Sequence, residues 1–229
     1  RDYKVTGVQT CALPISDLQG QKLFKPVNVF SREYQYNNDE TQFYRTLSEF
    51  VIDGRAYAAT LEGRAQTARM LVLITLQKLA ASSIAAIRNA LRKRRTTLAN
   101  LVGRSSESVS LPDEEQATFD DLAEAEEALP GSVAVLLMED EIQRLDELIA
   151  LADGIARETK IERLLQMIGE EFGPDEPILL FTEYKATQAL IINALYRRFG
   201  FGSATFINGD ERLDGLDQPS GSAKIVSQP

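Results

Sequence analysis

The chain has 229 residues, 44% of them hydrophobic and 26% charged, which is the composition of a globular protein with a substantial core. It contains no histidine, which excludes histidine-based acid–base pairs, catalytic triads and histidine metal sites. No apolar run approaches the ~20 residues of a membrane-spanning helix, and no secretory signal is present, so we expect a cytoplasmic protein without a membrane partner. The net charge of -9 argues at first against a nucleic-acid partner.

The first sixteen residues (1–16) differ from the rest of the chain. Their sequence, RDYKVTGVQTCALPIS, has no clear period and includes Cys11, the only cysteine. It resembles a peptide produced when a sequencing adapter is translated, and we interpret it as non-native. The alternative is a genuine N-terminal extension. If the segment is non-native, the remaining chain has no cysteine, which excludes disulfides, thiolate catalysis and cysteine zinc sites and fits a reducing compartment.

Residues 17–104 are predicted to be mainly helical. Asn38-Asp39 can cap a first helix, and Glu62 to Ala80 forms a second. A third helix should start near Ser82-Ser83, where either hydroxyl can accept from first-turn amides. The apolar residues that recur at helical spacing in these three helices are Phe43, Tyr44, Leu47, Phe50, Val51, Met70, Leu71, Leu73, Ile74, Leu76, Ile84, Ile87, Leu91 and Leu98.

Residues 105–131 form an acidic tract without lysine or arginine. It holds nine of the 34 acidic residues, and the 25 that remain match the 25 basic residues of the chain. The nine are Glu107, Asp113, Glu114, Glu115, Asp120, Asp121, Glu124, Glu126 and Glu127. The composition predicts a solvated linker or insertion, with a DNA-mimicking arm as the alternative. Because like charges repel phosphate, a DNA path should avoid this tract.

Residues 132–157 contain a predicted amphipathic helix, Val133 to Ile155. Its apolar positions are Met138, Ile142, Leu145, Leu148 and Ile149. Asp140-Glu141 follows an apolar run and could imitate the acidic motif of an ATPase at the end of a strand, as could Asp113 to Gln116. The helical spacing beyond Asp140-Glu141 favours the helix.

The segment Pro177 to Gly209 predicts a βαβ unit. Residues 178–181 are continuously apolar, as a strand buried on both faces of a parallel sheet requires. An amphipathic helix follows, with Arg197-Arg198 in its last turn and Gly200 as its stop. Residues 204–207 then predict the returning strand.

Four segments together resemble superfamily-two helicases, closest to the Snf/Swi-type DNA translocases and their HepA/RapA-like branch. FTEYKATQ, a helix and then ING are similar to the opening of the second RecA-like lobe. The other three, in the family's order, are Val27 to Val51, Leu76 to Leu98 with its Ser-Ser pair and basic end, and Glu158 to Gly173. The resemblance implies an α/β fold that is mostly helical. Residues 17–104 would hold the end of the first lobe and a helical region, which residues 132–157 continue, and residues 158–229 would begin the C-terminal RecA-like lobe.

The resemblance implies that the chain is a fragment of an ATP-dependent DNA translocase or helicase. Because no G-x-x-x-x-G-K-[ST] motif occurs, we expect the fragment to be catalytically inactive and to hold no cofactor, whereas its parent would use ATP and Mg and bind DNA. Two alternatives remain. One is a self-contained helical protein-interaction module without ATPase activity, and the other is an unrelated nucleotide-binding α/β enzyme fragment, which the absence of glycines after Thr182 disfavours.

Two groups of residues are candidates for contacting DNA. The resemblance implies one group, at the family's fourth and next motifs: Thr182, Tyr184, Lys185, Thr187, Asn208 and Gly209. The family more often has histidine before that glycine, so Asn208 departs from its pattern. The second group follows from charge alone, because arginine and lysine neutralise phosphate without reading sequence: Arg88, Arg92, Lys93, Arg94 and Arg95. For both groups the alternative is structural, as packing, capping or a solvated helix face. No metal ligands and no catalytic residues are predicted.

Overall fold

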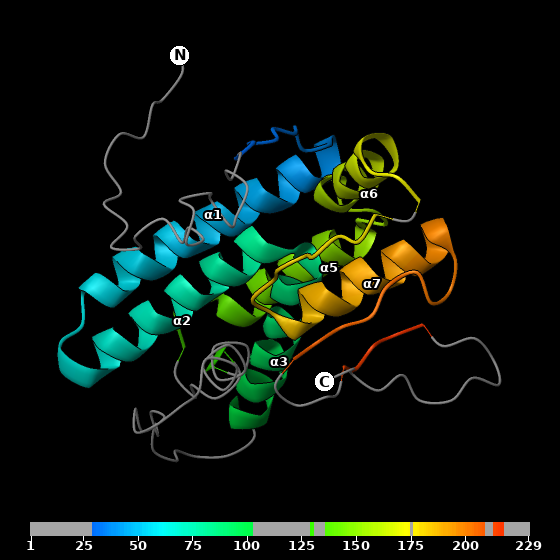
Figure 1. Cartoon of the computed structure of the whole chain (residues 1–229). Helices are drawn as coiled ribbons and strands as arrows, with labels where there is room; N and C mark the ends of the chain where they lie inside the picture. The colour runs from blue at the N-terminus through cyan, green and yellow to red at the C-terminus, as the bar shows by residue number, and fades with distance from the viewer. Residues whose placement is uncertain (1–28, 103–128, 131–135, 175, 209–212, 218–229) are drawn as a thin grey trace, which may run out of the picture. The chain divides into compact units, whose positions relative to one another are not determined.

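The computed structural model describes residues 29–102, 129–130, 136–174, 176–208 and 213–217, apart from the side chains of residues 64, 101 and 102. Residues 1–33 form one unit, of which only 29–33 are described, and residues 34–229 form a second. The second unit contains the helices α1 (Asn38–Ala59), α2 (Gly63–Ser82), α3 (Ile84–Val102), α5 (Glu141–Gly154), α6 (Thr159–Glu171) and α7 (Lys185–Phe199) (Figure 1).

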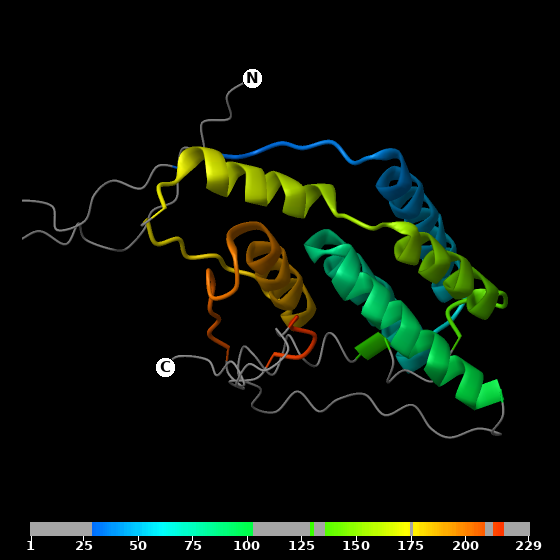
Figure 2. The same ribbon diagram turned by 90° about the vertical axis from the view of Figure 1, so that its right-hand side faces the viewer.

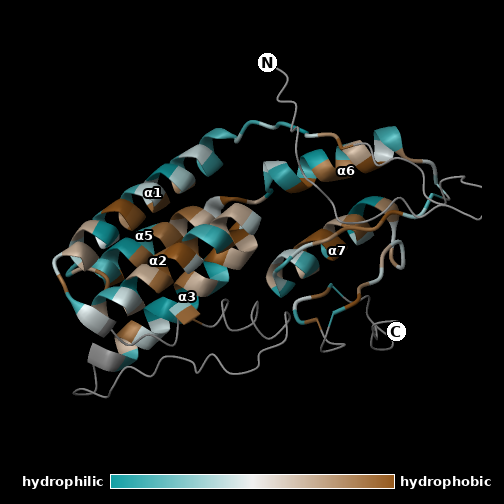
Figure 3. Cartoon of the chain, turned by 60° about the vertical axis from the view of Figure 1, so that its left-hand side comes forward, coloured by the Kyte–Doolittle hydropathy of each residue, from teal (hydrophilic) through white to brown (hydrophobic). Residues whose placement is uncertain are grey.

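The helices α1, α2, α3 and α5 form a four-helix bundle. Each packs against two of the others, in the cyclic order α1, α2, α3, α5. Apolar side chains at helical spacing are buried in the interior of the bundle. Figure 3 shows hydrophobic and hydrophilic residues alternating along these helices. Most of the predicted face residues are buried, including Phe43, Phe50, Leu73, Ile87 and Leu91. Leu71 and Ile74, both 41% exposed, were wrongly assigned to the buried face.

The helix starts show how local sequence sets the boundaries. The cap of α1 is Asn37 instead of the predicted Asn38-Asp39: its side chain accepts from the Glu40 amide at 2.9 Å, while Glu40 accepts from the Asn37 amide at 3.0 Å. This reciprocal pair is a capping box. At α3 the predicted cap is confirmed, because the Ser83 hydroxyl accepts from the Ala86 amide at 3.1 Å.

The predicted helix Val133 to Ile155 is shorter in the structure. Residues 136–140 are not helical and α5 begins at Glu141, while residues 131–135 lie outside the described part. The choice of helix over a strand with an acidic motif at Asp140-Glu141 is confirmed, since Asp140 is the N-cap residue of α5. Residues 1–16 and the acidic tract, apart from Leu129 and Pro130, also lie outside the described residues.

The helices α6 and α7 follow the bundle. α6 begins after Glu158, close to its predicted start, and α7 ends at Gly200, whose φ of 97° favours glycine. α7 packs against α3 and against α6 (Figure 2). Ile192, Tyr196 and Phe206 form a small second core, in which the Tyr196 hydroxyl donates to the Ala204 carbonyl at 3.1 Å.

The predicted βαβ unit is wrong, and with it the α/β class and the RecA-like lobe. The described residues are helical or irregular and contain no strand, although α7 itself lies where predicted. Leu179 is 73% exposed and Phe181 86% exposed, so the apolar run is not buried on either face. Strand formation requires a hydrogen-bonded neighbour, and the two segments, 177–183 and 204–208, are extended without pairing with each other. An apolar run shows hydrophobicity but not whether a pairing partner exists.

In the part of the chain that the structure describes, every helix is too short or too polar to serve as a membrane span.

Candidate functional site

The basic run of α3 divides into one buried and several exposed side chains. Arg94 is completely buried, whereas Arg92 and Lys93 are exposed and Arg95 is half-buried. This follows from helical geometry, because Arg94 stands three residues after Leu91 and four before Leu98, on the apolar stripe. The spacing was visible in the sequence and would have separated Arg94 from its neighbours.

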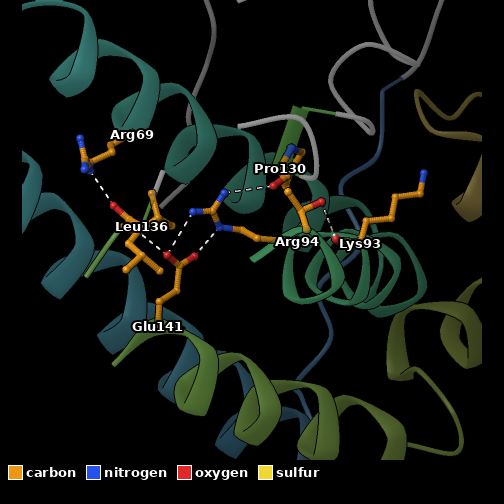
Figure 4. Close-up of polar contacts among 8 residues, drawn as sticks. Arg69, Lys93, Arg94, Pro130, Leu136 and Glu141 are labelled. Carbon is orange, nitrogen blue, oxygen red and sulfur yellow. Dashed lines mark hydrogen bonds and ion pairs between the residues drawn. The ribbon is translucent and has the colours of Figure 1, made fainter. Parts of the chain in front are cut away.

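Arg94 forms an ion pair with Glu141 inside the bundle (Figure 4). The guanidinium donates through Nε to Oε1 and through Nη2 to Oε2, the second bond at 3.1 Å, and both side chains have zero exposure. Nη1 donates to the Pro130 carbonyl at 3.0 Å, and Glu141 also accepts from the Leu137 amide. The two-pronged pair is satisfied on all sides and joins α3 to the start of α5. Arg94 is therefore not available to DNA.

Arg69 supports the same region from α2. Its Nε donates to the Leu136 carbonyl at 2.7 Å (Figure 4). Its Nη1 donates to the Ala65 carbonyl at 3.2 Å. Burial lowers the pKa of Arg69 from its ordinary value. Arg69 and Arg94 thus hold the backbone that enters α5 from two helices.

The other basic residues of α3 are close to acids of α5. Arg92 donates to Asp153 at 2.6 Å, and Arg95 donates to Asp146 at 2.8 Å. Arg88 Nη1 lies 3.9 Å from Asp153, and Arg88 Nε is buried without a hydrogen-bond partner among the described residues. The hydrogen bond that Arg95 donates to Asp146 raises the pKa of Arg95. Exposed pairs of this kind are weak and exchange with solvent.

The residues of the predicted fourth motif are mostly inside the protein. Tyr184 is 1% exposed and Thr187 is 4% exposed, while Thr182 and Lys185 are half-buried. The Asn208 amide donates to the Gln188 side chain at 3.1 Å, close to the end of the described segment. Gly209 lies outside the described residues. No described contact brings these residues together with the exposed cations Arg92 and Lys93.

Thr187 instead meets the Ser-Ser pair. Its Oγ1 lies 2.8 Å from the Ser82 hydroxyl and 2.8 Å from the Ser83 hydroxyl. These hydrogen bonds connect the first turn of α7 to the link between α2 and α3. Ser83 also caps α3, so a single hydroxyl serves both the cap and the contact with α7.

Glu158 caps α3 from a distant part of the chain. Its carboxylate accepts from the Ile84 amide and from the Ala85 amide, both at 3.0 Å. With the Ser83 hydroxyl on Ala86, the first amides of α3 are satisfied. The carbonyl of Glu158 meanwhile accepts from the Ile161 and Glu162 amides at the start of α6. One residue therefore begins one helix and caps another.

The next two residues reach two further helices. The Thr159 amide donates to Glu40 of α1 at 2.8 Å, and the Thr159 hydroxyl donates to the same carboxylate. The Lys160 ammonium donates to the carbonyls of Ala81 and Ser82, at 3.1 and 3.0 Å. A cation at this position suits the carbonyl end of α2. We call Glu158, Thr159 and Lys160 the clasp.

The clasp lies where all four segments of the sequence resemblance meet. Glu40 comes from the first segment, Ser82 and Ser83 from the second, the clasp from the third and Thr187 from the fourth. We call these seven residues the polar junction. Helical periodicity did not predict the junction, because the residues are separated by up to 147 positions and belong to five helices or helix ends.

Burial dominates the electrostatics of the polar junction. It raises the pKa of Glu158, and Glu40 adds to that rise, whereas the Ile84 and Ala85 amides oppose it. Burial likewise raises the pKa of Tyr34 to about 12 and raises the pKa of Tyr44 further. The Tyr44 hydroxyl donates to the Ala80 carbonyl at 3.1 Å, beside the contacts of Lys160. The junction thus contains two carboxylates that are satisfied mainly by amides and hydroxyls.

The arrangement does not suggest metal chemistry. In the described ranges no group of three or more potential ligands among histidine, cysteine and acidic side chains occurs. Glu40 and Glu158 already accept hydrogen bonds from protein donors at both carboxylate oxygens. Comparison of the chain with family models, with curated proteins and with solved structures found no match in any of the three.

Proposed function

We propose that the chain is a helical part of an ATP-dependent DNA translocase or helicase of the Snf/Swi type, without ATPase activity of its own. The ATP and Mg of such a motor would be held by a part of the protein that this sequence does not contain. The absence of cysteine from residues 17–229 supports a cytoplasmic location.

The polar junction is the observation that carries this proposal. Four short segments suggested the family, and each supplies a side chain to one set of hydrogen bonds. Their meeting at one set of contacts supports the proposal that the four segments belong to a single functional unit. The contact also gives the segments a shared physical role, since they join the four-helix bundle to α6 and α7.

In this proposal, the exposed cations of α3 contact the DNA. Arg92 is half exposed and Lys93 is exposed, so both can approach a phosphate. The Arg92 pair with Asp153 is solvent-exposed and can exchange for a phosphate at little cost. Arg88 can contribute its half-buried guanidinium, while Arg94 belongs to the bundle interior.

The test is DNA binding by fluorescence anisotropy at several salt concentrations. We expect weak binding that the double substitution Arg92→Ala and Lys93→Ala reduces, with the salt slope falling by about one for each lost phosphate contact. Arg45→Ala is the control, because Arg45 is an exposed cation on α1 with an i,i+4 partner. Equal binding by the wild type and the double variant would contradict the proposed surface.

A second candidate function is a self-contained helical protein-interaction module. The helical fold of the described residues favours it, as do the apolar side chains of Leu179, Phe181 and Ile207, which are exposed and accessible to a partner. This candidate requires no DNA and no motor. If anisotropy detects no salt-sensitive DNA binding and circular dichroism shows a stable fold, the interaction module is favoured over the translocase.

A further inference from the structure

The clasp connects the four-helix bundle to α6. On one side, Glu158, Thr159 and Lys160 hydrogen-bond to the ends of α3, α1 and α2. On the other, they form the start of α6, which packs against α7. Glu158 ends the link at 155–158 that separates α5 from α6, and Thr159 and Lys160 directly follow it. A change at the clasp therefore acts first on α6, since α7 has its own contacts with α3 and its N-cap residue Tyr184 belongs to the bundle core.

The remainder of α6 is much less buried than its beginning. Ile161 is its buried residue, and the later apolar positions Leu164, Leu165 and Ile168 remain half-buried. In the bundle, by contrast, α1 alone buries seven residues. Hydrophobic burial scales with the apolar area removed from water. The attachment of α6 thus depends on the polar contacts at its first turn to a greater degree than does the attachment of any bundle helix.

We propose that the clasp is a releasable latch, which couples docking of α6 on the four-helix bundle to the capping of α3 by Glu158. In the closed state the Glu158 carboxyl group satisfies two amides of α3, while Thr159 and Lys160 bond to α1 and α2. In the released state α3 keeps its own Ser83 cap, so the bundle can remain folded while the latch is open. The inference does not rest on the proposed function.

We expect the protonation state of Glu158 to regulate the closing of the latch, because this carboxyl group lies close to several charged and titratable groups. The groups that face this carboxylate are Glu40 of α1, Arg88 of α3, Lys160 beside it, and Tyr34 and Tyr44. The raised pKa of Glu158 means that the closed state takes up a proton more readily than the released one. Its contribution to closure is therefore complete below the ordinary pKa and is lost as the pH rises through the raised pKa. Mild acid closes the latch, and higher pH loosens it.

The experiment measures the distance between α1 and α6 with two spin labels. The labels are placed at the exposed positions Arg45 and Arg163, after Cys11→Ser removes the only cysteine of the chain. The wild type, Glu158→Ala, Glu158→Gln and the control Glu162→Ala are compared from pH 8 to pH 5.5, above the sequence pI of about 4.8. Glu162 is an exposed acid of the same helix.

We expect a second, longer distance that grows about fivefold in population in Glu158→Ala, from the loss of one cap. The glutamine variant imitates the protonated carboxyl, so its closed fraction should exceed that of the wild type at pH 8 and should not change with pH, while the wild type approaches it as the pH falls. Unchanged distances in both Glu158 variants would overturn the latch. Equal pH profiles of the wild type and Glu158→Gln would overturn the regulation of the latch by protonation of Glu158. If the alanine variant fails to fold, Glu158→Gln tests the latch in its place.

Discussion

The bundle interior and the polar junction bury charge in two different ways. In the bundle, Arg94 and Glu141 neutralise each other at zero exposure. At the junction, two carboxylates approach each other, and amides, hydroxyls and a lysine at a helix end surround them. A closed pair of opposite charges strongly resists change, because removal of one partner leaves an unpaired buried charge. A pair of like charges held by amides responds to protons. The first arrangement therefore suits structure and the second suits regulation.

The largest effect should follow from breaking the bundle pair. Arg94→Ala leaves Glu141 buried and uncompensated, so we expect a loss of about 3–5 kcal/mol in the free energy of unfolding, measured with urea. Arg92→Ala, in the same helix but exposed, should lose less than about 1 kcal/mol. Equal losses in the two variants would mean that the Arg94 pair is open to water.

Replacing both partners of the Arg94–Glu141 pair gives a sharper test of it. Arg94→Met with Glu141→Leu fills the site with apolar groups and removes both charges, and we expect it to recover most of the lost stability. A double variant as unstable as Arg94→Ala would show that the carbonyl contact to Pro130 matters more than the ion pair. Because Arg94→Ala should destabilise the fold, a loss of DNA binding in that variant would not report on a phosphate contact.

Two helical glycines, Gly54 in the bundle and Gly169 in α6, differ in the space that is available to an added side chain. A Cβ on Gly54 of α1 would lie 2.8 Å from Leu73 Cδ2 and 3.2 Å from Met138 Cε, whereas a Cβ on Gly169 of α6 would meet nothing within 4 Å. Gly169→Ala should stabilise the protein by about 1 kcal/mol through helix propensity. Gly54→Ala should be about 1–2 kcal/mol less favourable than that because it overpacks the core. Thermal unfolding of both variants checks the difference, and equal shifts would mean that Leu73 moves aside freely.

A smaller effect is expected at the cap of α1. Asn37→Ala removes the side-chain acceptor of the capping box and should cost about 1 kcal/mol. Asn37→Asp keeps an acceptor and should cost only a few tenths of that, since both residues are good caps. Urea unfolding of the two variants tests this, and the prediction fails if aspartate is as harmful as alanine.

The smallest effect is expected in the extended segment before α7. Phe181 is 86% exposed, so Phe181→Ser should change the free energy of unfolding by less than about 0.5 kcal/mol. The result separates this segment from the buried core, where Phe50→Ala should cost about 3–5 kcal/mol. A loss above about 1 kcal/mol at Phe181 would show that the apolar run is covered in solution.

Sequence periodicity predicted the helices well because each one buries a stripe of its own residues. The faces around Phe43, Ile87 and Leu145 depend only on spacing along the chain. The two strands predicted from apolar runs were wrong, because strand pairing depends on a neighbour elsewhere in the chain. The buried charges Glu40, Arg94 and Glu141 all lie on apolar stripes, so periodicity could have marked them as interior. Periodicity does not reveal their long-range partners: Arg94 and Glu141 lie 47 residues apart, and Thr159 lies 119 residues from Glu40.

Native-state hydrogen exchange on the unmodified chain tests the contrast between the two regions most directly. Amides of the bundle, such as those around Leu73 and Leu91, should exchange only through global unfolding, while amides of α6 should exchange at a lower free energy. The lower free energy should rise as the pH falls from 8 to 5.5, as closure of the clasp requires. The same opening free energy for α6 and the bundle would contradict the account, because the chain would then unfold as one unit without a latch.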